Sequence, residues 1–227
     1  MRLRFGLTGG IGSGKSTVAA LLVECGAALV DTDAISRALT ATGGAALPAL
    51  AAAFGAGIVG ADGAMDRDRM RALAFGDSGA KARLEAILHP MIGAEAARQA
   101  ALAGERPLVF DVPLLTESSH WRTRVDRVLV VDCAEATQVE RVRRRSGWSE
   151  EAVLRAIALQ APRRARRAIA DATIYNDGLS LAQLAAEVRA LWALWVPARP
   201  PDAAPDPVTD GRPAAGPVEQ SIRDSAC

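Results

Sequence analysis

The chain has 227 residues, half of them hydrophobic and few aromatic, so we expect one helix-rich soluble domain with at most a small appendage. Its 27 basic and 26 acidic residues leave a formal net charge of +1. This charge is too small for the whole protein to attract nucleic acid or a membrane surface, but a local site could still bind an anion. The three cysteines lie far apart without a C-x-x-C pair, which argues against a disulfide framework or a zinc site and is typical of a reducing cytosol.

Short apolar strands alternate with helical stretches from the start of the chain to Trp195. Each strand is a continuous apolar run, which is typical of strands covered by helices on both faces. The expected strands are RLRFGLT (2–8), AALVDTD (27–33), PLVFDVP (107–113), RVLVVD (127–132) and ATIYND (172–177). The expected helices span 16–25, 34–40, 47–54, 66–75, 80–88, 90–103, 137–145, 150–160 and 181–195. This alternation predicts a doubly wound α/β fold with a parallel sheet, whose ligands gather at the carboxyl ends of the strands.

A glycine-rich loop, LTGGIGSGKST, follows the first strand and leads into the first helix. Residues 9–16 match the pattern G-x-x-x-x-G-K-[ST], and the strand before and helix after it are the context in which that pattern binds phosphates. Backbone N–H groups of such a loop can point inward, and the helix N-terminus adds partial positive charge. We expect Lys15 to reach the β- and γ-phosphates, Ser16 to bind Mg²⁺ and Thr17 to meet an α-phosphate. The predicted ATP-binding residues of this segment are Gly10, Ile11, Gly12, Ser13, Gly14, Lys15, Ser16 and Thr17.

A phosphate loop alone does not identify the reaction, because GTPases, motor ATPases and small-molecule kinases share it. The sequence has no N-K-x-D element for reading guanine, and a motor would usually need a larger chain. Asp33, at the end of the second strand, favours a kinase, because its carboxylate would face the γ-phosphate and could orient an acceptor hydroxyl. The same residue could cap the following helix. Asp111, which ends the third strand, could hold Mg²⁺ through water or be a structural hydrogen-bonding residue.

The chain resembles the dephospho-coenzyme A kinase family from about residue 3 to residue 194. The segments LTGGIGSGKSTVA, LVDTDAISRAL, LHPMI, FDVPLLTES, RVLVVD and QAPRRARRAIADATIYNDG occur in the order and spacing of that family. The resemblance implies a five-stranded P-loop core similar to adenylate kinase within residues 1–195. It also implies a helical CoA-binding insert at about 60–104 and a mobile lid at about 141–165.

The same resemblance implies an activity and its substrates. The expected reaction is ATP-dependent phosphorylation of the ribose 3′-hydroxyl of dephospho-CoA, the last step of CoA biosynthesis, with Mg²⁺ accompanying ATP. Another small-molecule kinase of this architecture and a nucleotide-gated binding module remain as alternatives. The expected partners are ATP and dephospho-CoA, without nucleic acid or membrane, for a cytoplasmic monomer or weak homo-oligomer.

The resemblance further assigns roles to individual residues. Lys15, Asp33 and Arg141 are expected to be catalytic, with Asp33 as the carboxylate that orients the acceptor and Arg141 as a lid arginine. Asn176 is expected beside the adenine of ATP. The expected acceptor-binding residues are Thr8, Asp33, Arg37, His89, Pro113 and Leu114, and the expected metal ligands are Ser16 and Asp111.

Two further features have both a functional and a purely structural interpretation. His89 and Pro90 stand at the expected junction of two helices, where proline suits a first helical turn and histidine is more often structural than catalytic. Arginines cluster near 141–145 and 163–167, where most are expected to lie on solvated helix faces. A closing lid must nevertheless supply cations to the transferring phosphoryl group. One residue of the second cluster should therefore contact phosphate, out of Arg163, Arg164, Arg166 and Arg167.

The segment 196–227 differs in composition from the rest of the chain. Seven of the twelve prolines fall between Pro197 and Pro217, among Asp, Ala and Gly. Such a segment cannot bury a core or propagate a helix, so we predict a disordered tail, either inert or a docking segment for a partner. No apolar run resembles a signal peptide or a membrane span.

Overall fold

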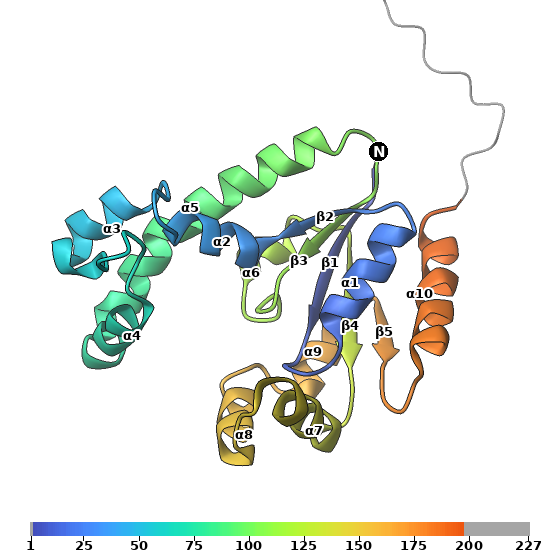
Figure 1. Ribbon diagram of the computed structural model, residues 1–227. Coiled ribbons are helices and arrows are strands. Elements are labelled where there is room, and N and C mark those ends of the chain that lie inside the picture. Colours follow the sequence, from blue (N-terminus) through green and yellow to red (C-terminus); the bar gives the residue numbers. More distant parts are fainter. Residues whose placement is uncertain (1, 198–227) are drawn as a thin grey trace, which may run out of the picture. The chain divides into compact units, whose positions relative to one another are not determined.

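The computed structural model describes residues 2–197, and the predicted tail lies outside these residues from position 198 on. One parallel sheet of five strands has the order β2-β3-β1-β4-β5, which confirms the predicted doubly wound α/β fold (Figure 1). Because all strands are parallel, their carboxyl ends meet at one edge of the sheet. The strands are β1 (Arg4–Gly9), β2 (Ala28–Asp31), β3 (Leu108–Asp111), β4 (Arg127–Asp132) and β5 (Ala172–Tyr175).

Several helices begin at a residue whose side chain accepts a hydrogen bond from the first turn, as N-caps do. Asp31 caps α2, Asp66 caps α4, Ser149 caps α8, and Ser180 forms a capping box with Gln183 at α10. The helices are α1 (Lys15–Glu24), α2 (Thr32–Thr40), α3 (Leu47–Phe54), α4 (Arg67–Gly76), α5 (Ser78–Leu102), α6 (Ser119–Arg122), α7 (Glu135–Ser146), α8 (Glu150–Ala158), α9 (Arg163–Ala168) and α10 (Leu181–Trp195), with the 3₁₀ helix η1 (Ala56–Ile58). None of the described helices is both long and apolar enough to cross a bilayer.

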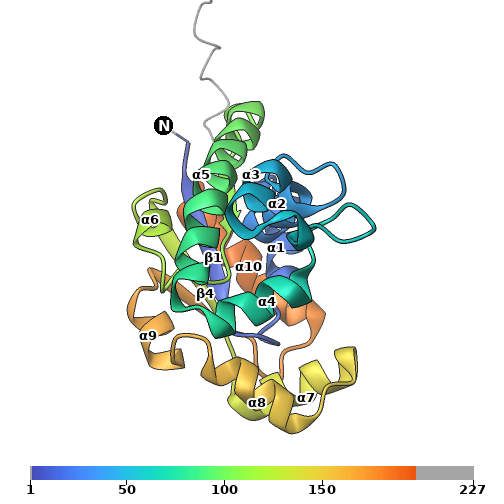
Figure 2. The same ribbon diagram turned by 90° about the vertical axis from the view of Figure 1, so that its left-hand side faces the viewer.

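Helices cover both faces of the sheet, and each face has its own apolar core. On one face α1 and α10 pack over β1 and β4, where the ring of Phe5 stacks on that of Trp195 with 5.2 Å between centroids. On the other face α2, α5 and α6 pack over β2 and β3, with Phe110 against Trp121. Figures 1 and 2 show α1 and α10 together on one side of β1 and α5 on the opposite side. This double cover explains why the strands read as unbroken apolar runs.

A third, smaller core lies away from the sheet. It joins α3, η1, α4 and the first half of α5 around the buried side chains of Leu50, Ile58 and Met70. Leu88 of α5 belongs to this core, whereas Ala96 and Ala100 farther along the same helix belong to the core over the sheet. One long helix therefore connects the helical region to the sheet. The predicted bounds of the insert and the lid remain predictions.

The predicted helix junction at His89 is wrong, because α5 runs without a break from Ser78 to Leu102 and contains Pro90 in its interior. An interior proline removes one backbone donor and costs about 3 kcal/mol. Packing of both halves of α5 into separate cores offsets that cost, so tertiary contacts override the local signal. His89 consequently lies exposed in the middle of a helix rather than between two.

The predicted end of the second strand is also wrong. β2 ends at Asp31, and Asp33 lies in the first turn of α2. The reason is that the Asp31 side chain accepts a hydrogen bond from the backbone N–H of Ala34 at 2.8 Å, which starts the helix two residues earlier than expected. The capping role considered for Asp33 therefore belongs to Asp31. Asp33 keeps a carboxylate at the helix N-terminus, where the macrodipole favours negative charge.

Candidate active site

The glycine loop between β1 and α1 has the backbone geometry of an anion-binding nest. Gly12 and Gly14 have φ angles of 74° and 93°, in the left-handed region that glycine adopts without strain. A Cβ on Gly14 would also collide with Nδ2 of Asn176, so only glycine fits there. No acidic side chain occupies the first turn of α1, so nothing in that turn neutralises the positive end of the helix dipole.

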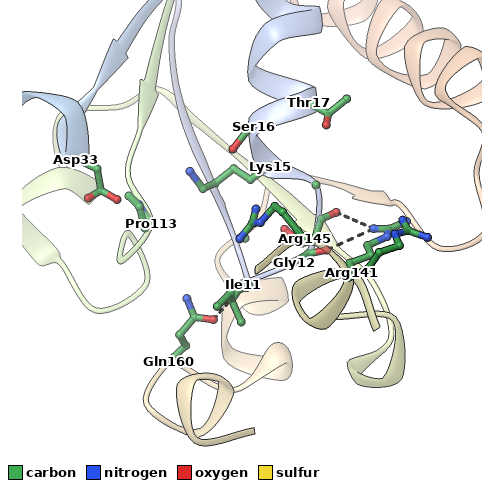
Figure 3. Close-up of a pocket in the computed structure, with 15 residues that line it drawn as sticks. Ile11, Gly12, Lys15, Ser16, Thr17, Asp33, Pro113, Arg141, Arg145 and Gln160 are labelled. Atoms are coloured by element: carbon green, nitrogen blue, oxygen red, sulfur yellow. Dashed lines mark hydrogen bonds between the residues drawn. The ribbon is translucent and has the colours of Figure 1, made fainter. Parts of the chain in front are cut away.

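The loop forms one wall of a pocket of about 670 Å³ at the carboxyl edge of the sheet. Figure 3 shows Asp33 and Pro113 across the pocket from the loop, with the Lys15 side chain extending from the loop toward them. Arg141 and Arg145 lie on the loop side. The pocket thus combines backbone N–H groups and cations with a carboxylate on the opposite wall. Its lining residues are Gly9, Gly10, Ile11, Gly12, Ser13, Gly14, Lys15, Ser16, Thr17, Asp33, Pro113, Arg141, Arg144, Arg145 and Gln160.

Lys15 forms an ion pair with Asp111 at the end of β3: Nζ donates to Oδ1 of a carboxylate that is only 6% exposed. Burial raises the pKa of Asp111 above its ordinary value, and the Lys15 charge opposes this shift. The negative charges of Asp31 and Asp33 raise that pKa further, which means that the three carboxylates lie close enough to interact. The cation of Lys15 therefore stabilises a group of acids that would otherwise repel one another.

The wall opposite the loop is held by hydroxyl groups. Thr8 Oγ1 donates to the carbonyl oxygen of Pro113 at 3.0 Å, and Thr32 Oγ1 donates to that of Asp111 at 2.9 Å. The first bond joins the segment after β3 to β1, and the second joins the end of β3 to the start of α2. Asp33 and Pro113 are thereby placed on elements that are fixed to each other.

The cationic side of the pocket comes from α7. Arg141, Arg144 and Arg145 line it, and their spacing of three and four residues places them on one face of the helix. Arg141 Nη1 donates to the carbonyl oxygens of Gly12 and Ser13 at 3.5 and 3.4 Å. The buried Asn176 also binds the loop, because its Nδ2 donates to Ser13 O at 2.8 Å.

The other predicted acceptor-binding residues lie outside the pocket lining. Arg37 is exposed and pairs with Asp31 at 3.6 Å. Leu114 is exposed next to Pro113. His89 is exposed in the middle of α5. The structure thus groups Asp33, Pro113 and, through Pro113, Thr8, and leaves Arg37, His89 and Leu114 apart from this group.

Four polar residues near the loop were not among the predicted site residues. Gln160 Oε1 accepts a hydrogen bond from Ile11 N at 2.9 Å, and Gln138 Nε2 donates to Ile11 O at 2.8 Å. Asp132 binds Arg163 through two hydrogen bonds of 2.9 and 2.8 Å. Glu117 accepts from the backbone N–H of Ala161 at 2.8 Å. Asp132 could be recognised in the sequence as the acidic residue that ends the fourth strand. No local sequence pattern indicates the roles of Gln138 and Gln160, because their partner Ile11 lies far away along the chain.

The oxygen-bearing side chains near the loop suit a magnesium ion whose remaining ligands are water and nucleotide oxygens. Within residues 2–197, no three His, Cys, Asp or Glu side chains gather closely enough to hold a metal by themselves. The pocket does supply the Ser16 hydroxyl, with the Asp111 carboxylate beside Lys15. Mg²⁺ prefers such oxygen ligands and usually binds through one or two protein groups plus phosphates.

Comparison with known proteins agrees with this geometry. The family described as dephospho-CoA kinase matches residues 3–182. A dephospho-CoA kinase of Albidiferax ferrireducens is 56% identical over 82% of this chain and 89% of its own length. The crystal structure of TT1252 from Thermus thermophilus is 36% identical, with a TM-score of 0.73 over 85% of this chain and 97% of that one. The fold is shared with a dephospho-CoA kinase from Campylobacter jejuni, which is 22% identical with a TM-score of 0.63 over 86% and 98% of the two chains. The chain belongs to the dephospho-CoA kinase family.

Proposed function

We propose that this chain transfers the γ-phosphoryl group of ATP to the ribose 3′-hydroxyl of dephospho-CoA, which yields CoA and ADP. Family membership makes the chain a kinase of CoA biosynthesis. The single observation that carries the mechanism is the pocket in which the glycine loop and Lys15 face Asp33 (Figure 3). A terminal phosphoryl group held by the loop would point toward that carboxylate.

The loop and its cations serve ATP. The backbone N–H groups of residues 10–17 and the start of α1 would bind the phosphates, with Lys15 reaching the β- and γ-phosphates. Lys15 could exchange its present partner Asp111 for a phosphate if Mg²⁺ took its place beside that carboxylate. Asn176 would line the adenine side of the loop, and its hydrogen bond to Ser13 O supports this role.

Asp33 serves the acceptor. Its position across the pocket supports a role in orienting the 3′-hydroxyl and taking its proton as the bond to phosphorus forms. Pro113, held by Thr8, would form the neighbouring wall, and Arg37, His89 and Leu114 would contact more distant parts of dephospho-CoA.

Ser16 and Asp111 would hold Mg²⁺, which when bound neutralises charge on the phosphates. Arg141, with Arg144 and Arg145 beside it, would supply cations from the lid. A lid that closes over both substrates excludes water, which otherwise competes with the hydroxyl as acceptor.

We expect a cytoplasmic monomer or weak homo-oligomer that binds neither nucleic acid nor membrane. Cys25 and Cys133 are both free thiols, which supports a reducing compartment. Light scattering of the purified protein tests the expected oligomeric state.

A panel of acceptors tests the reaction. ADP release is measured with ATP and dephospho-CoA, shikimate, gluconate or no acceptor, and dephospho-CoA should give the highest kcat/KM by orders of magnitude. A better alternative acceptor would identify a different small-molecule kinase. Slow turnover with every acceptor would favour a nucleotide-gated binding module.

A further inference from the structure

A buried guanidinium group lies directly behind the first half of the glycine loop. Arg166 of α9 is only 4% exposed, although the neighbouring arginines Arg164 and Arg167 are exposed. Its Nη2 atom lies 2.8 Å from the position that a Cβ on Gly10 would take, so a larger residue there would displace the guanidinium group. Arg166 is absent from the pocket lining, so it reaches the nucleotide site only through the loop.

Arg166 also holds the connection between α8 and α9, residues 159–162. Its Nη1 donates to the carbonyl oxygen of Ala161, whose N–H in turn donates to Glu117. The preceding residue, Gln160, accepts the hydrogen bond of Ile11 N at 2.9 Å. Arg166 thus binds the backbone one residue after Gln160, whose side chain binds the loop.

A second buried polar side chain meets the loop at the same place. Gln138 of α7 is 1% exposed, donates to Ile11 O at 2.8 Å, and would also collide with a Cβ on Gly10. Both peptide groups of Ile11 are therefore bound by glutamines that precede α9 in the chain, and Arg166 packs beside the same backbone.

The charge of Arg166 is poorly neutralised. Burial lowers its pKa, while the nearby carboxylates of Asp132 and Glu117 oppose this shift. Each carboxylate has another partner, because Asp132 binds Arg163 and Glu117 binds Ala161 N. Arg166 Nε makes no hydrogen bond within the described chain. A buried cation whose neighbouring carboxylates also bind other groups is unfavourable unless a further anion binds nearby. The adjacent glycine loop has the geometry to bind such an anion.

We propose that Arg166 is a positioning residue for ATP: it holds Gln160 against Ile11, keeps the Gly10–Ile11 backbone in its phosphate-binding conformation, and adds a buried positive charge behind it. The inference rests on the proposed binding of ATP by the glycine loop. It assigns to Arg166 a role in nucleotide affinity, not a direct contact with phosphate.

Binding of each substrate to full-length variants tests this role. Calorimetry with a non-hydrolysable ATP analogue should show at least a tenfold weaker Kd for Arg166→Met, since a charged group and its hydrogen bond are lost. The Kd for dephospho-CoA should change less than twofold. Arg166→Lys, which restores the charge, should recover most of the loss. The matched control Arg71→Met, at an exposed arginine of α4, should bind the analogue within twofold of wild type.

Three results would overturn the proposal. They are an unchanged analogue Kd in folded Arg166→Met, an equal loss of affinity for both substrates, and a failure of Arg166→Lys to recover affinity. If Arg166→Met does not fold, Gln160→Ala decides: it should weaken analogue binding at least fivefold without changing the Kd of dephospho-CoA, and no effect would refute the link through Ile11. Failure of the proposed function itself would look different, because wild type would then fail to bind the analogue or to phosphorylate dephospho-CoA.

Discussion

Lys15 has one anionic partner in the structure and another in the proposed complex, so its charge has both a structural and a catalytic use. In the structure it pairs with the buried Asp111. In the complex it would bind phosphate. The sequence predicted the second use from the loop pattern, but not the first, because Asp111 lies 96 positions away and only the parallel pairing of β1 with β3 brings the two together.

Lys15→Ala should lower kcat by orders of magnitude, because the cation that stabilises charge on the transferring group is removed. The free energy of unfolding should fall by about 1–3 kcal/mol, since the buried Asp111 loses its partner. Steady-state ADP release and denaturant titration measure these effects. The chain offers a matched control in its other lysine, because Lys81 is exposed and pairs with the surface residue Glu85, so Lys81→Ala should change neither quantity. Normal turnover of Lys15→Ala would contradict the proposed phosphate contact.

Asp33→Asn should also lower kcat by orders of magnitude with an intact fold, because an amide cannot take the proton of the acceptor hydroxyl. The KM for ATP should change little, since the loop lies on the opposite wall of the pocket. Asp68→Asn is a suitable control, because Asp68 occupies the first turn of α4 as Asp33 does that of α2, but is exposed and outside the pocket. If Asp33→Asn keeps near-normal kcat, Asp33 is not the base.

At the level of elements, local patterns predicted most helices and strands, with many ends displaced by one or two residues and the short helices α6 and η1 missed. The two errors that matter for the site are the end of β2 and the break expected at His89. The helix 47–54 and the strand 127–132 match the structure in both ends. β2 ends early because an Asp31 side chain, rather than residue propensity, starts α2. α5 continues through Pro90 because its two halves enter different apolar cores. Both errors arise where contacts outside the local segment decide the backbone.

Pro90→Ala should raise the free energy of unfolding by about 1–3 kcal/mol, because a backbone donor is restored inside a helix that is already continuous. Thermal and denaturant unfolding measure the gain. Pro48→Ala is the matched control, because Pro48 lies in the first turn of α3, where proline is tolerated and its removal should bring no gain. A loss of stability in Pro90→Ala would show that α5 needs the proline.

At the level of the whole molecule, the residues of the proposed site lie at the carboxyl edge of the parallel sheet, away from its amino edge. The phosphate loop, Asp33 and Asp111 gather at the carboxyl ends of the strands, as the sequence predicted from strand order and end residues. The loop residues were the easiest to predict because they are contiguous. The sequence named Arg166 only as one of four candidate arginines. Its burial behind the loop, and the roles of the glutamines at 138 and 160, could not be predicted, because segments distant in sequence bring these residues to the loop.

The opposite, amino edge of the sheet should affect stability alone. Asp126 accepts hydrogen bonds from Arg4 at the start of β1, which lower the pKa of that carboxyl. A lowered pKa in the folded state contributes stability above the ordinary pKa of aspartate that is lost as the pH falls through the lowered value. Asp126→Asn should therefore cost up to about 1 kcal/mol at pH 7, given that the pair is partly exposed, and less near pH 3. Urea titrations at both pH values test this, and kcat should stay unchanged. An equal cost at the two pH values would contradict the assignment.

The most direct test of the proposed chemistry is the identity of the product formed from ATP and dephospho-CoA. ADP release is followed while mass spectrometry and phosphorus NMR determine how many phosphoryl groups the acceptor gains and at which hydroxyl. The proposed function predicts one CoA for each ADP, with the new phosphate on the ribose 3′-oxygen. ADP formed without a phosphorylated acceptor, or phosphate on another oxygen, would contradict it.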